Sequence, residues 1–499
     1  MHGTMAHRED APADRRRDAG PAHGPESPAG QVAHEGPAVG RRTGGPGARS
    51  GGVLLAGTLA SNLLSYAFFV VLSRSLDAGR LGAVGSIVNL SVLAGVPALG
   101  LQLVGARLVS HAGTGRARTV ASGVLRFSTR LGLGVAALLA AASPAVAHLL
   151  DLDVALVLTL AATMVPITVT FACQGLLQGA ERFAGLALVL GASGVAKFLA
   201  AWGSSWFGGD VAAVVVLFGL GWVAVAALGL AVVRRGLGRP HDAAPSSSSS
   251  SDAAAGPAAE TSLPDHRAAV GHLGRLVAAA VVPTSGLLFL SSVDVLLARI
   301  HLDADASGAY TVGALFEKAA FWGLSFLATL FYPAMARAAD RRGAILRALT
   351  ITAGAGVVGV AVAVLLGGPL VALVGGPAYS ALAPLVWRFT LLGVCLALVQ
   401  VIAYAGLAAA SHRMGVAMWV AGGLAVAVTS LNHGDVAAVV DGMLVVAAAL
   451  VVVGAVIEWR WIRLSPRDLP RDDARYTDVD TDAGDLSARR RARSVRHRR

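Results

Sequence analysis

Twelve long apolar segments alternate with short loops along this chain, and its basic residues collect in every second loop. About 35 of the 41 Lys and Arg residues fall on one side of these segments, and two fall in loops on the other side. A helix needs about 20 apolar residues to cross the hydrocarbon core of a bilayer. Cytoplasmic loops carry the excess of Lys and Arg. The pattern therefore predicts an all-α polytopic membrane protein with both termini in the cytoplasm.

Composition agrees, because 55% of the residues are hydrophobic and only 14% are charged, against about 25% charged in soluble domains. The net charge of +11 does not indicate nucleic acid as a partner, because the basic residues flank membrane spans. There they obey the positive-inside rule and attract anionic lipid headgroups. The predicted spans are 52–73, 83–106, 124–147, 154–178, 185–206, 211–233, 276–298, 309–335, 346–374, 381–409, 414–431 and 436–458.

A low-complexity segment rich in Ser, Ala and Pro divides the spans six and six, and it cannot bury enough apolar area to fold. Residues 1–50 contain no apolar core of a signal peptide, so the first span is expected to act as an uncleaved signal anchor. The expected organisation is a disordered cytoplasmic tail (1–50), a six-helix bundle (51–235), a disordered cytoplasmic linker (236–272), a second six-helix bundle (273–462) and a disordered tail (463–499).

The two halves resemble each other. The first span ends in VLSRSLD, with Arg74, and the seventh ends in LLARIHLD, with Arg299. The second and eighth spans exit into Arg107 and Arg337, each followed by a basic loop. An even number of spans in each half gives both halves the same orientation, and transporters built from such parallel repeats place their substrate at the repeat interface. We therefore expect two bundles around a central cavity.

A stripe of polar side chains runs along the first span at helical spacing. One interpretation is that this stripe faces the water-filled cavity, with Asn62 and Tyr66 as substrate-binding candidates. The other is close helix packing with interhelical hydrogen bonds from Ser and Thr. The stripe consists of Thr58, Ser61, Asn62, Ser65, Tyr66 and Ser73, and the seventh span carries Thr284, Ser285, Ser291 and Ser292.

Ionisable residues within spans are the stronger indication of a site, because each costs at least about 2.5–3.5 kcal/mol to insert. Cations can hold an anionic headgroup such as a pyrophosphate, and carboxylates can carry a coupling ion. Two alternatives remain: ion pairs between helices, for example Asp294 with Lys318, and arginines that extend to the outer interface. The cationic candidates are Arg74, Lys197, Arg299, Lys318 and Arg388, and the coupling-ion candidates are Asp294 and Glu317.

Signs of catalysis are weak. Asp151 and Asp153 share an outer loop near His148, but acidic residues on short loops commonly serve solubility. The sequence has no phosphate-binding loop and no spacing of metal ligands, so we expect no cofactor and no metal. Cys173 and Cys395 fall inside spans and are expected to be packing residues rather than a disulfide.

Several segments carry a family likeness. Ser61–Leu76 (SNLLSYAFFVVLSRSL), followed by Leu81-Gly82, resembles the opening of Wzx-type polysaccharide biosynthesis flippases. Val293–Arg299 (VDVLLAR), Gly308–Val312 (GAYTV) and Phe331–Arg337 (FYPAMAR) resemble the start of that family's second half. These flippases belong to the multidrug/oligosaccharidyl-lipid/polysaccharide (MOP) exporter superfamily. The likeness covers about residues 50–460, without the tails and the linker.

The resemblance implies a plasma-membrane flippase, not an enzyme, that moves an undecaprenyl-pyrophosphate-linked oligosaccharide from the inner to the outer leaflet by alternating access. It places spans 1, 2, 7 and 8 around the cavity. The implied partners are the lipid-linked glycan, the bilayer and other membrane proteins of polysaccharide assembly. The alternatives are a multidrug or metabolite antiporter of the same superfamily, a peptidoglycan-precursor flippase, and a membrane glycosyltransferase or polymerase. The short outer loops argue against the last, and the twelve spans argue against the precursor flippase.

Overall fold

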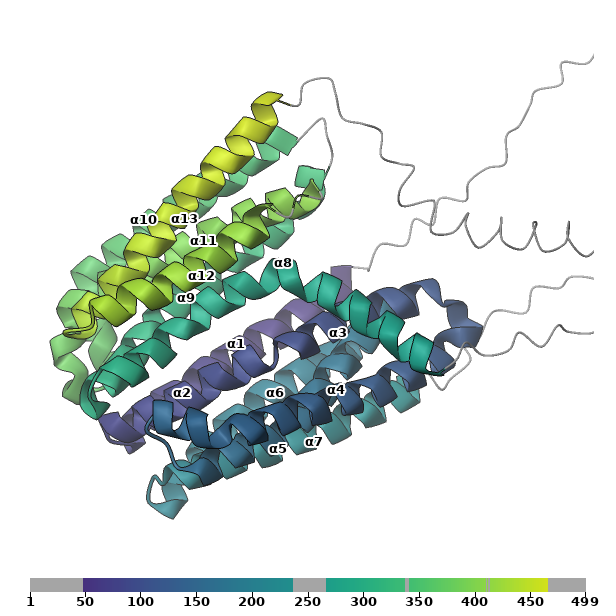
Figure 1. Ribbon diagram of the computed structural model, residues 1–499, viewed down its shortest axis with the longest axis horizontal. Coiled ribbons are helices and arrows are strands. Elements are labelled where there is room, and N and C mark those ends of the chain that lie inside the picture. Colours follow the sequence, from purple (N-terminus) through teal and green to yellow (C-terminus); the bar gives the residue numbers. More distant parts are fainter. Residues whose placement is uncertain (1–47, 237–265, 337–340, 410, 412, 465–499) are drawn as a thin grey trace, which may run out of the picture. The chain divides into compact units, whose positions relative to one another are not determined.

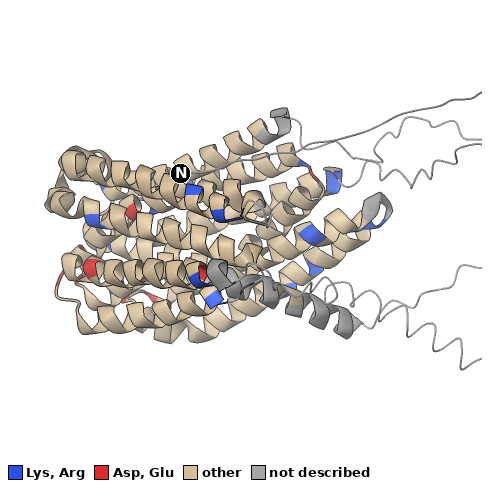
Figure 2. Cartoon of the chain, turned by 90° about the horizontal axis from the view of Figure 1, so that it is seen from above, with Lys and Arg blue, Asp and Glu red and all other residues tan. Residues whose placement is uncertain are grey.

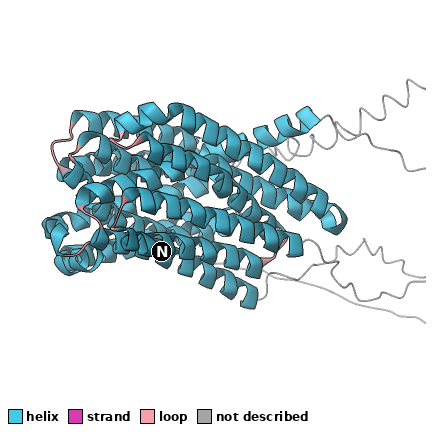
Figure 3. Ribbon diagram, turned by 90° about the horizontal axis from the view of Figure 1, so that it is seen from below, coloured by secondary structure: helices cyan, strands magenta, loops and turns pink. Residues whose placement is uncertain are grey.

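The computed structural model describes residues 48–236, 266–336, 341–409, 411 and 413–464. Contacts divide the chain into Met1–Gly45 and Pro46–Arg499, and every described residue belongs to the second unit. Within the described ranges the chain is helical, with short connecting loops (Figure 3). Most of both predicted tails and of the predicted linker lies outside these ranges, so the expected domain boundaries stay predictions.

The N-terminal half runs from purple to blue-green in Figure 1, and the C-terminal half runs from teal to yellow. The first comprises α1 (Ala48–Ser75), α2 (Ala78–Ala94), α3 (Val96–His111), α4 (Gly113–Leu149), α5 (Val154–Gly179), α6 (Phe183–Ser204), the short 3-10 helix η1 (Ser205–Phe207) and α7 (Val211–Gly236). The second comprises α8 (His266–His301), α9 (Ala304–Ala336), α10 (Arg341–Val374), the 3-10 segment η2 (Pro377–Leu385), α11 (Val386–Ala408), α12 (Arg413–Leu431) and α13 (Val436–Leu464).

Ten helical spans of the described residues are long and apolar enough to cross a membrane, and the bent pair α2–α3 raises the number to eleven. The remaining predicted span corresponds to α8. This helix is 36 residues long but is not among the eleven. The protein is therefore an all-α, multi-pass membrane protein, as the sequence predicts. Charged side chains are sparse along the helices (Figure 2).

The second predicted span, 83–106, is broken in the structure. Helix α2 ends at Ala94, α3 begins at Val96, and the two axes differ by 41°. Pro97 lies in the first turn of α3, where its missing N–H has no intrahelical partner to lose. A proline ring would clash with the preceding turn of a continuous helix. Pro97 therefore explains why this span bends, whereas its counterpart α9 runs unbroken.

Helix packing repeats between the halves. In the N-terminal half α1 packs on α6, α3 and α4 pack on α5, and α7 packs on α5 and α6. In the C-terminal half α8 packs on α12, α9 and α10 pack on α11, and α13 packs on α11 and α12. These pairs correspond one to one when the first half is laid on the second. The internal repeat expected from the sequence is therefore a repeat of structure.

Small features repeat as well. Asp77 and Asp303 each begin the second span of their half, where the carboxylate accepts the backbone N–H three residues on, of Arg80 and of Ala306. Such caps satisfy N–H groups that have no partner inside the helix. Pro144 of α4 and Pro369 of α10 each lie inside the helix, five residues before its end. The two halves thus share local chemistry as well as packing.

Most contacts between the halves are made by α1, α2, α3, α8 and α9. Helices α2 and α9 approach closely because each offers glycine to the other. A Cβ on Gly308 would collide with the carbonyl oxygen of Ala78, and one on Gly82 would lie 2.7 Å from Ser307 Oγ. Small residues of this kind allow backbones to touch where no hydrophobic effect drives helix association.

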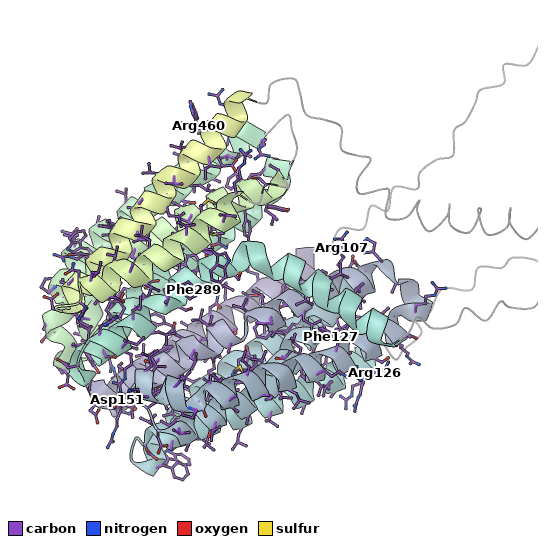
Figure 4. All side chains as sticks on the ribbon, viewed as in Figure 1. Arg107, Arg126, Phe127, Asp151, Phe289 and Arg460 are labelled. Carbon is purple, nitrogen blue, oxygen red and sulfur yellow. The ribbon has the colours of Figure 1, made fainter. Side chains whose placement is uncertain are left out.

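Which end of the helices faces the cytoplasm stays a prediction from the basic loops. Figure 4 places Asp151 at one end of the N-terminal half and Arg107 and Arg126 at the other. Cys173 and Cys395 are buried and free, as expected for packing residues.

We predict that Gly308→Ala lowers the melting temperature of the detergent-solubilised protein. Overfilling a packed contact costs about 1–3 kcal/mol. The matched control is Gly323→Ala in the same helix, because a Cβ there meets no atom within 4 Å. Equal melting temperatures for the two variants would show that the α2–α9 contact is not tight.

Candidate functional site

Two carboxylates and one lysine form a cluster inside the C-terminal half. Asp294 of α8 and Glu317 of α9 have 0% exposed surface. The Lys318 ammonium lies 4.0 Å from a carboxylate oxygen of each, and it donates to the carbonyl oxygen of Ser291 at 3.0 Å. The pairing of Asp294 with Lys318 that the sequence suggested is present. It joins the first and second spans of this half.

Aromatic and backbone groups close the cluster. The Tyr310 ring is fully buried, its hydroxyl lies beside Asp294 and Glu317, and it packs edge-on against Phe389 of α11 at 5.1 Å. A Cβ on Gly393 of α11 would collide with the carbonyl oxygen of Glu317. Helix α11 therefore covers this part of α9 with almost no space between the backbones.

The charges of this cluster do not balance. Among the described residues, Lys318 is the cation within ion-pair distance of both acids, and the Tyr310 hydroxyl beside them carries no charge that could balance the second carboxylate. A buried charge without a partner is strongly disfavoured, so a group in this position neutralises or acquires a counterion. One carboxylate therefore needs a proton or a bound cation. The described residues contain no group of three or more His, Cys, Asp or Glu that could hold a metal ion.

Arg299, at the end of α8, reaches into the N-terminal half. Its Nε and Nη2 each donate at 2.9 Å, to the carbonyl oxygens of Leu150 and Asp151. Nη2 also lies 3.5 Å from a carboxylate oxygen of Asp151, and Nη1 lies 3.5 Å from the carbonyl oxygen of Gly79. Only 8% of Arg299 is exposed. The guanidinium thus binds the C-terminal end of α4 and the beginning of α2.

Arg74, at the end of α1, makes the corresponding contact with the C-terminal half. Its Nη2 donates to the carbonyl oxygens of Leu373 at 2.6 Å and Ala372 at 3.4 Å. The neighbouring Ser73 hydroxyl donates to the carbonyl oxygen of Val374 at 2.7 Å. These three carbonyls belong to the last turn of α10. Arg74 itself is exposed.

The two arginines are equivalent in the repeat, and so are the helix ends that they bind, because α4 and α10 are the third spans of their halves. The last four carbonyls of a helix have no intrahelical partner, and the C-terminal end of a helix attracts cations. Each half therefore supplies a cation to an unsatisfied helix end of the other. We call Arg74 and Arg299, with the carbonyls they bind, the reciprocal arginine contacts.

The polar stripe of α1 divides between two environments. The Ser61 hydroxyl lies 3.4 Å from that of Ser193, and the Ser65 hydroxyl accepts from Lys197 Nζ at 3.4 Å. Both contacts join α1 to α6, so this part of the stripe follows the packing interpretation. Asn62 is exposed and Tyr66 is half-buried, and their assignment to a substrate cavity stays a prediction.

Lys197 and Arg388 lie apart from the acid cluster. The Lys197 ammonium lies 5.7 Å from the centre of the Trp222 ring of α7, in addition to its contact with Ser65. Arg388 of α11 forms an ion pair with Asp441 of α13. Both cations are bound within their own half, and their role in binding substrate stays a prediction.

Sequence reasoning missed one buried ion pair. Arg341, at the start of α10, lies 3.0 Å from a carboxylate oxygen of Glu458 in α13 and donates to the carbonyl oxygen of Ala405 at 3.0 Å. Glu458 is 5% exposed. The sequence placed Arg341 in a loop and Glu458 at the end of the last span. Glu458 is an acidic residue at a span end that is otherwise basic, and this could have indicated an ion pair.

Comparison with known proteins identifies the family. Residues 48–339 match the family described as polysaccharide biosynthesis protein. The chain belongs to the polysaccharide biosynthesis protein family. No curated protein matches the chain in sequence.

Solved structures give the same answer for the fold. An inward-facing multidrug resistance MATE transporter of the MOP superfamily is 14% identical, with a TM-score of 0.61 over 83% of this chain and 98% of that one. The lipid II flippase MurJ in an inward closed conformation is 11% identical, with a TM-score of 0.62 over 81% and 86%. The family and these likenesses confirm the resemblance to Wzx-type flippases and the fold of two six-helix bundles. The protein has the family and fold of a membrane transporter.

We predict that Arg299→Gln destabilises the protein by roughly 1.5–3 kcal/mol, the range for hydrogen bonds to charged groups. The reason is that the Leu150 and Asp151 carbonyls lose a buried partner. Arg299→Lys should restore only part of this loss, because an ammonium does not form the same planar fork.

The control is Arg80→Gln, at the same end of the helices. Arg80 is 54% exposed and pairs with Asp77 within its own helix, so its removal should change stability by about 0–1 kcal/mol. Chemical unfolding in detergent measures all three variants. Similar losses for Arg299→Gln and Arg80→Gln would mean that Arg299 contributes no more than a surface ion pair.

Proposed function

We propose that this protein moves an undecaprenyl-pyrophosphate-linked oligosaccharide from the inner to the outer leaflet of the plasma membrane by alternating access. The observation that carries this proposal is membership of the polysaccharide biosynthesis family over residues 48–339, on a fold shared with a lipid II flippase. The cytoplasmic location of both termini and partnership with other polysaccharide-assembly proteins belong to the same proposal.

Alternating access requires two arrangements of the halves. The reciprocal arginine contacts and the α2–α9 glycine contact hold the halves together at the end that carries Asp151. The distribution of basic loops makes this the outer end. The structure then corresponds to a state that is closed towards the outside. Export requires Arg74 and Arg299 to leave the carbonyls of the opposite half, which water can then solvate.

The acid cluster supplies a means of coupling. Asp294 and Glu317 share one lysine, so the cluster carries one negative charge more than it can neutralise. Uptake of a proton or a monovalent cation balances that charge, and release restores the imbalance. Because α8 and α9 also form the contact with the N-terminal half, a change in this charge can alter the stability of the closed outer end.

A multidrug or metabolite antiporter is the second candidate. The likeness of the fold to a MATE transporter and the presence of two buried carboxylates favour it. A strain that lacks the gene separates the two: the flippase proposal expects lipid-linked oligosaccharide to accumulate and surface polysaccharide to be lost, with drug resistance unchanged. The opposite pattern would favour the antiporter.

We predict that Lys318→Gln and Arg388→Gln each reduce surface polysaccharide in a complementation assay while protein levels in the membrane stay normal. Loss of Lys318 leaves two acids without a cation, and loss of Arg388 removes a candidate contact to pyrophosphate. Asp441→Asn is the control for Arg388, because it breaks the same ion pair and keeps the cation. If Asp441→Asn is as harmful as Arg388→Gln, Arg388 acts through its pair; full activity in both cation variants contradicts the assignment.

We also predict that Asp294→Asn or Glu317→Gln abolishes the pH dependence of transport in reconstituted vesicles. Each variant removes the surplus negative charge that a proton would balance. Glu458→Gln is the matched control: Glu458 is also buried, but it is paired with Arg341 at 3.0 Å, so its loss should leave the pH dependence intact. A fluorescent lipid-linked glycan analogue reports transport. An unchanged pH profile in both acid variants would exclude this cluster as the coupling site.

A further inference from the structure

A long groove runs between α6 and α7 on one surface of the N-terminal half. One part has a volume of about 730 Å³ and an apolar lining. A second part, of about 560 Å³, lies where α6 begins and α7 ends. The apolar part is lined on α6 by Leu188, Val195 and Leu199, and on α7 by Leu220, Ala224 and Leu228.

The two parts follow the same helix faces. On α6 the lining passes from Ala184 in the second part to Leu188 in the first, and on α7 it passes from Val232 to Leu228. A separation of four residues is about one helical turn, so each pair lies on one face. From Ala184 to Leu199 the groove spans about 22 Å at a rise of 1.5 Å per residue. This length covers most of the hydrocarbon core of a bilayer.

The end of the groove is cationic. Arg182 and Arg235 line the second part together with Glu181. Both arginines are exposed, and neither makes an ion pair with another described residue. Two cations against one carboxylate leave a net positive charge. The distribution of basic loops places this end at the cytoplasmic face.

Two glycines of α6, which have no side chain, lie along the bottom of the groove. A Cβ on Gly191 would meet no atom within 4 Å, and one on Gly185 would lie 2.8 Å from Val232 Cγ1. Gly191 therefore leaves open space at mid-groove, and Gly185 allows α7 to approach α6 below it. Four leucine and valine side chains along the groove are 44–59% exposed, so the groove is open along its side.

The groove faces away from the other half. Helix α6 packs on α1 through a different face, where Gly194 approaches Ser61. Helix α1 in turn contacts α9 of the C-terminal half. The cationic part of the groove also touches Val53 of α1. A molecule between α6 and α7 is thus separated from the C-terminal half by α1, and along the apolar part by α6 as well. It does not lie where a transported substrate would have to pass.

We propose that this groove binds one anionic membrane phospholipid, with its phosphate between Arg182 and Arg235 and an acyl chain along α6 and α7. Guanidinium groups bind phosphate oxygens through two parallel hydrogen bonds. The apolar wall by itself would accept any lipid chain, and the two arginines select the negative headgroup. Anionic lipids of the cytoplasmic leaflet supply that charge at the required depth. The bound lipid is a resident of the N-terminal half rather than its cargo.

Native mass spectrometry of the purified full chain tests this site with added phosphatidylglycerol, with phosphatidylcholine of the same chains, and with undecaprenyl phosphate. The wild type should retain one phosphatidylglycerol that Arg182→Gln/Arg235→Gln loses, with its affinity weakened on the order of tenfold or more. Arg116→Gln/Arg126→Gln removes the same charge from exposed positions of α4 outside the groove, and it should retain the lipid.

A second pair of variants tests the groove without changing charge. Gly191→Leu fills the open floor and should reduce phosphatidylglycerol binding, whereas Gly134→Leu, on α4 with equally open space, should not. The proposal is overturned if Arg182→Gln/Arg235→Gln and Gly191→Leu retain phosphatidylglycerol as the wild type does. It is also overturned if Arg116→Gln/Arg126→Gln loses as much of the lipid as Arg182→Gln/Arg235→Gln. Tighter retention of undecaprenyl phosphate than of phosphatidylglycerol at this site also overturns it, because the groove would then hold the substrate lipid. If a variant of one pair does not elute as a folded protein in gel filtration, the other pair still tests the proposal.

Discussion

The C-terminal ends of α4 and α10 expose carbonyl groups that no helix can satisfy from within, and an arginine of the opposite half satisfies each of them. Leu150 and Arg299 are buried in this arrangement, so the arginine replaces the water that an exposed helix end would bind. Because the halves are structural repeats, the same type of arginine–carbonyl contact occurs in both. Because the donors and acceptors lie in different halves, the stability of two helix ends depends on how the halves are arranged.

The same dependence makes the contact reversible. Carbonyls at a helix end near the membrane surface can exchange an arginine for water, whereas the glycine contact between α2 and α9 has no such substitute: once the backbones separate, the close packing is lost. Arg299 is 8% exposed, but Arg74 is exposed and already close to solvent. The two contacts are thus equivalent in topology and unequal in burial. In the proposed alternating-access cycle, opening of this end should begin at Arg74, whose release costs less.

Some of these features could be predicted from the sequence and others could not, depending on whether the interacting group is a side chain or a backbone carbonyl. Membrane spans depend on apolar length, which a sequence shows directly, and each predicted span corresponds to a helix or a bent helix pair. The helix starts were not predicted: α4 begins at Gly113 and α8 at His266, each about ten residues before the predicted span. The break at Pro97 was missed because proline is also tolerated within membrane helices. The equivalence of Arg74 and Arg299 was visible in VLSRSLD and LLARIHLD. Their partners were not, because every residue has a carbonyl and nothing in Leu150 or Leu373 marks it as an acceptor. Among the pairs of ionisable side chains, Asp294 with Lys318 was anticipated, since few charges lie at that depth, whereas Arg341 with Glu458 and Arg388 with Asp441 were not.

The remaining charges show why burial alone does not identify a transport site. Arg388 with Asp441 and Arg341 with Glu458 balance one cation with one acid, and each links α13 to a neighbouring helix. Lys197 has a serine and an aromatic ring rather than an acid. Asp294, Glu317 and Lys318 differ from all of these, because two acids with no exposed surface share one cation among the described residues. A balanced pair gains nothing by taking up an ion, whereas an unbalanced cluster must take one up or remain strained. This imbalance is the reason for proposing that a coupling ion binds between α8 and α9, the helices that also contact the N-terminal half.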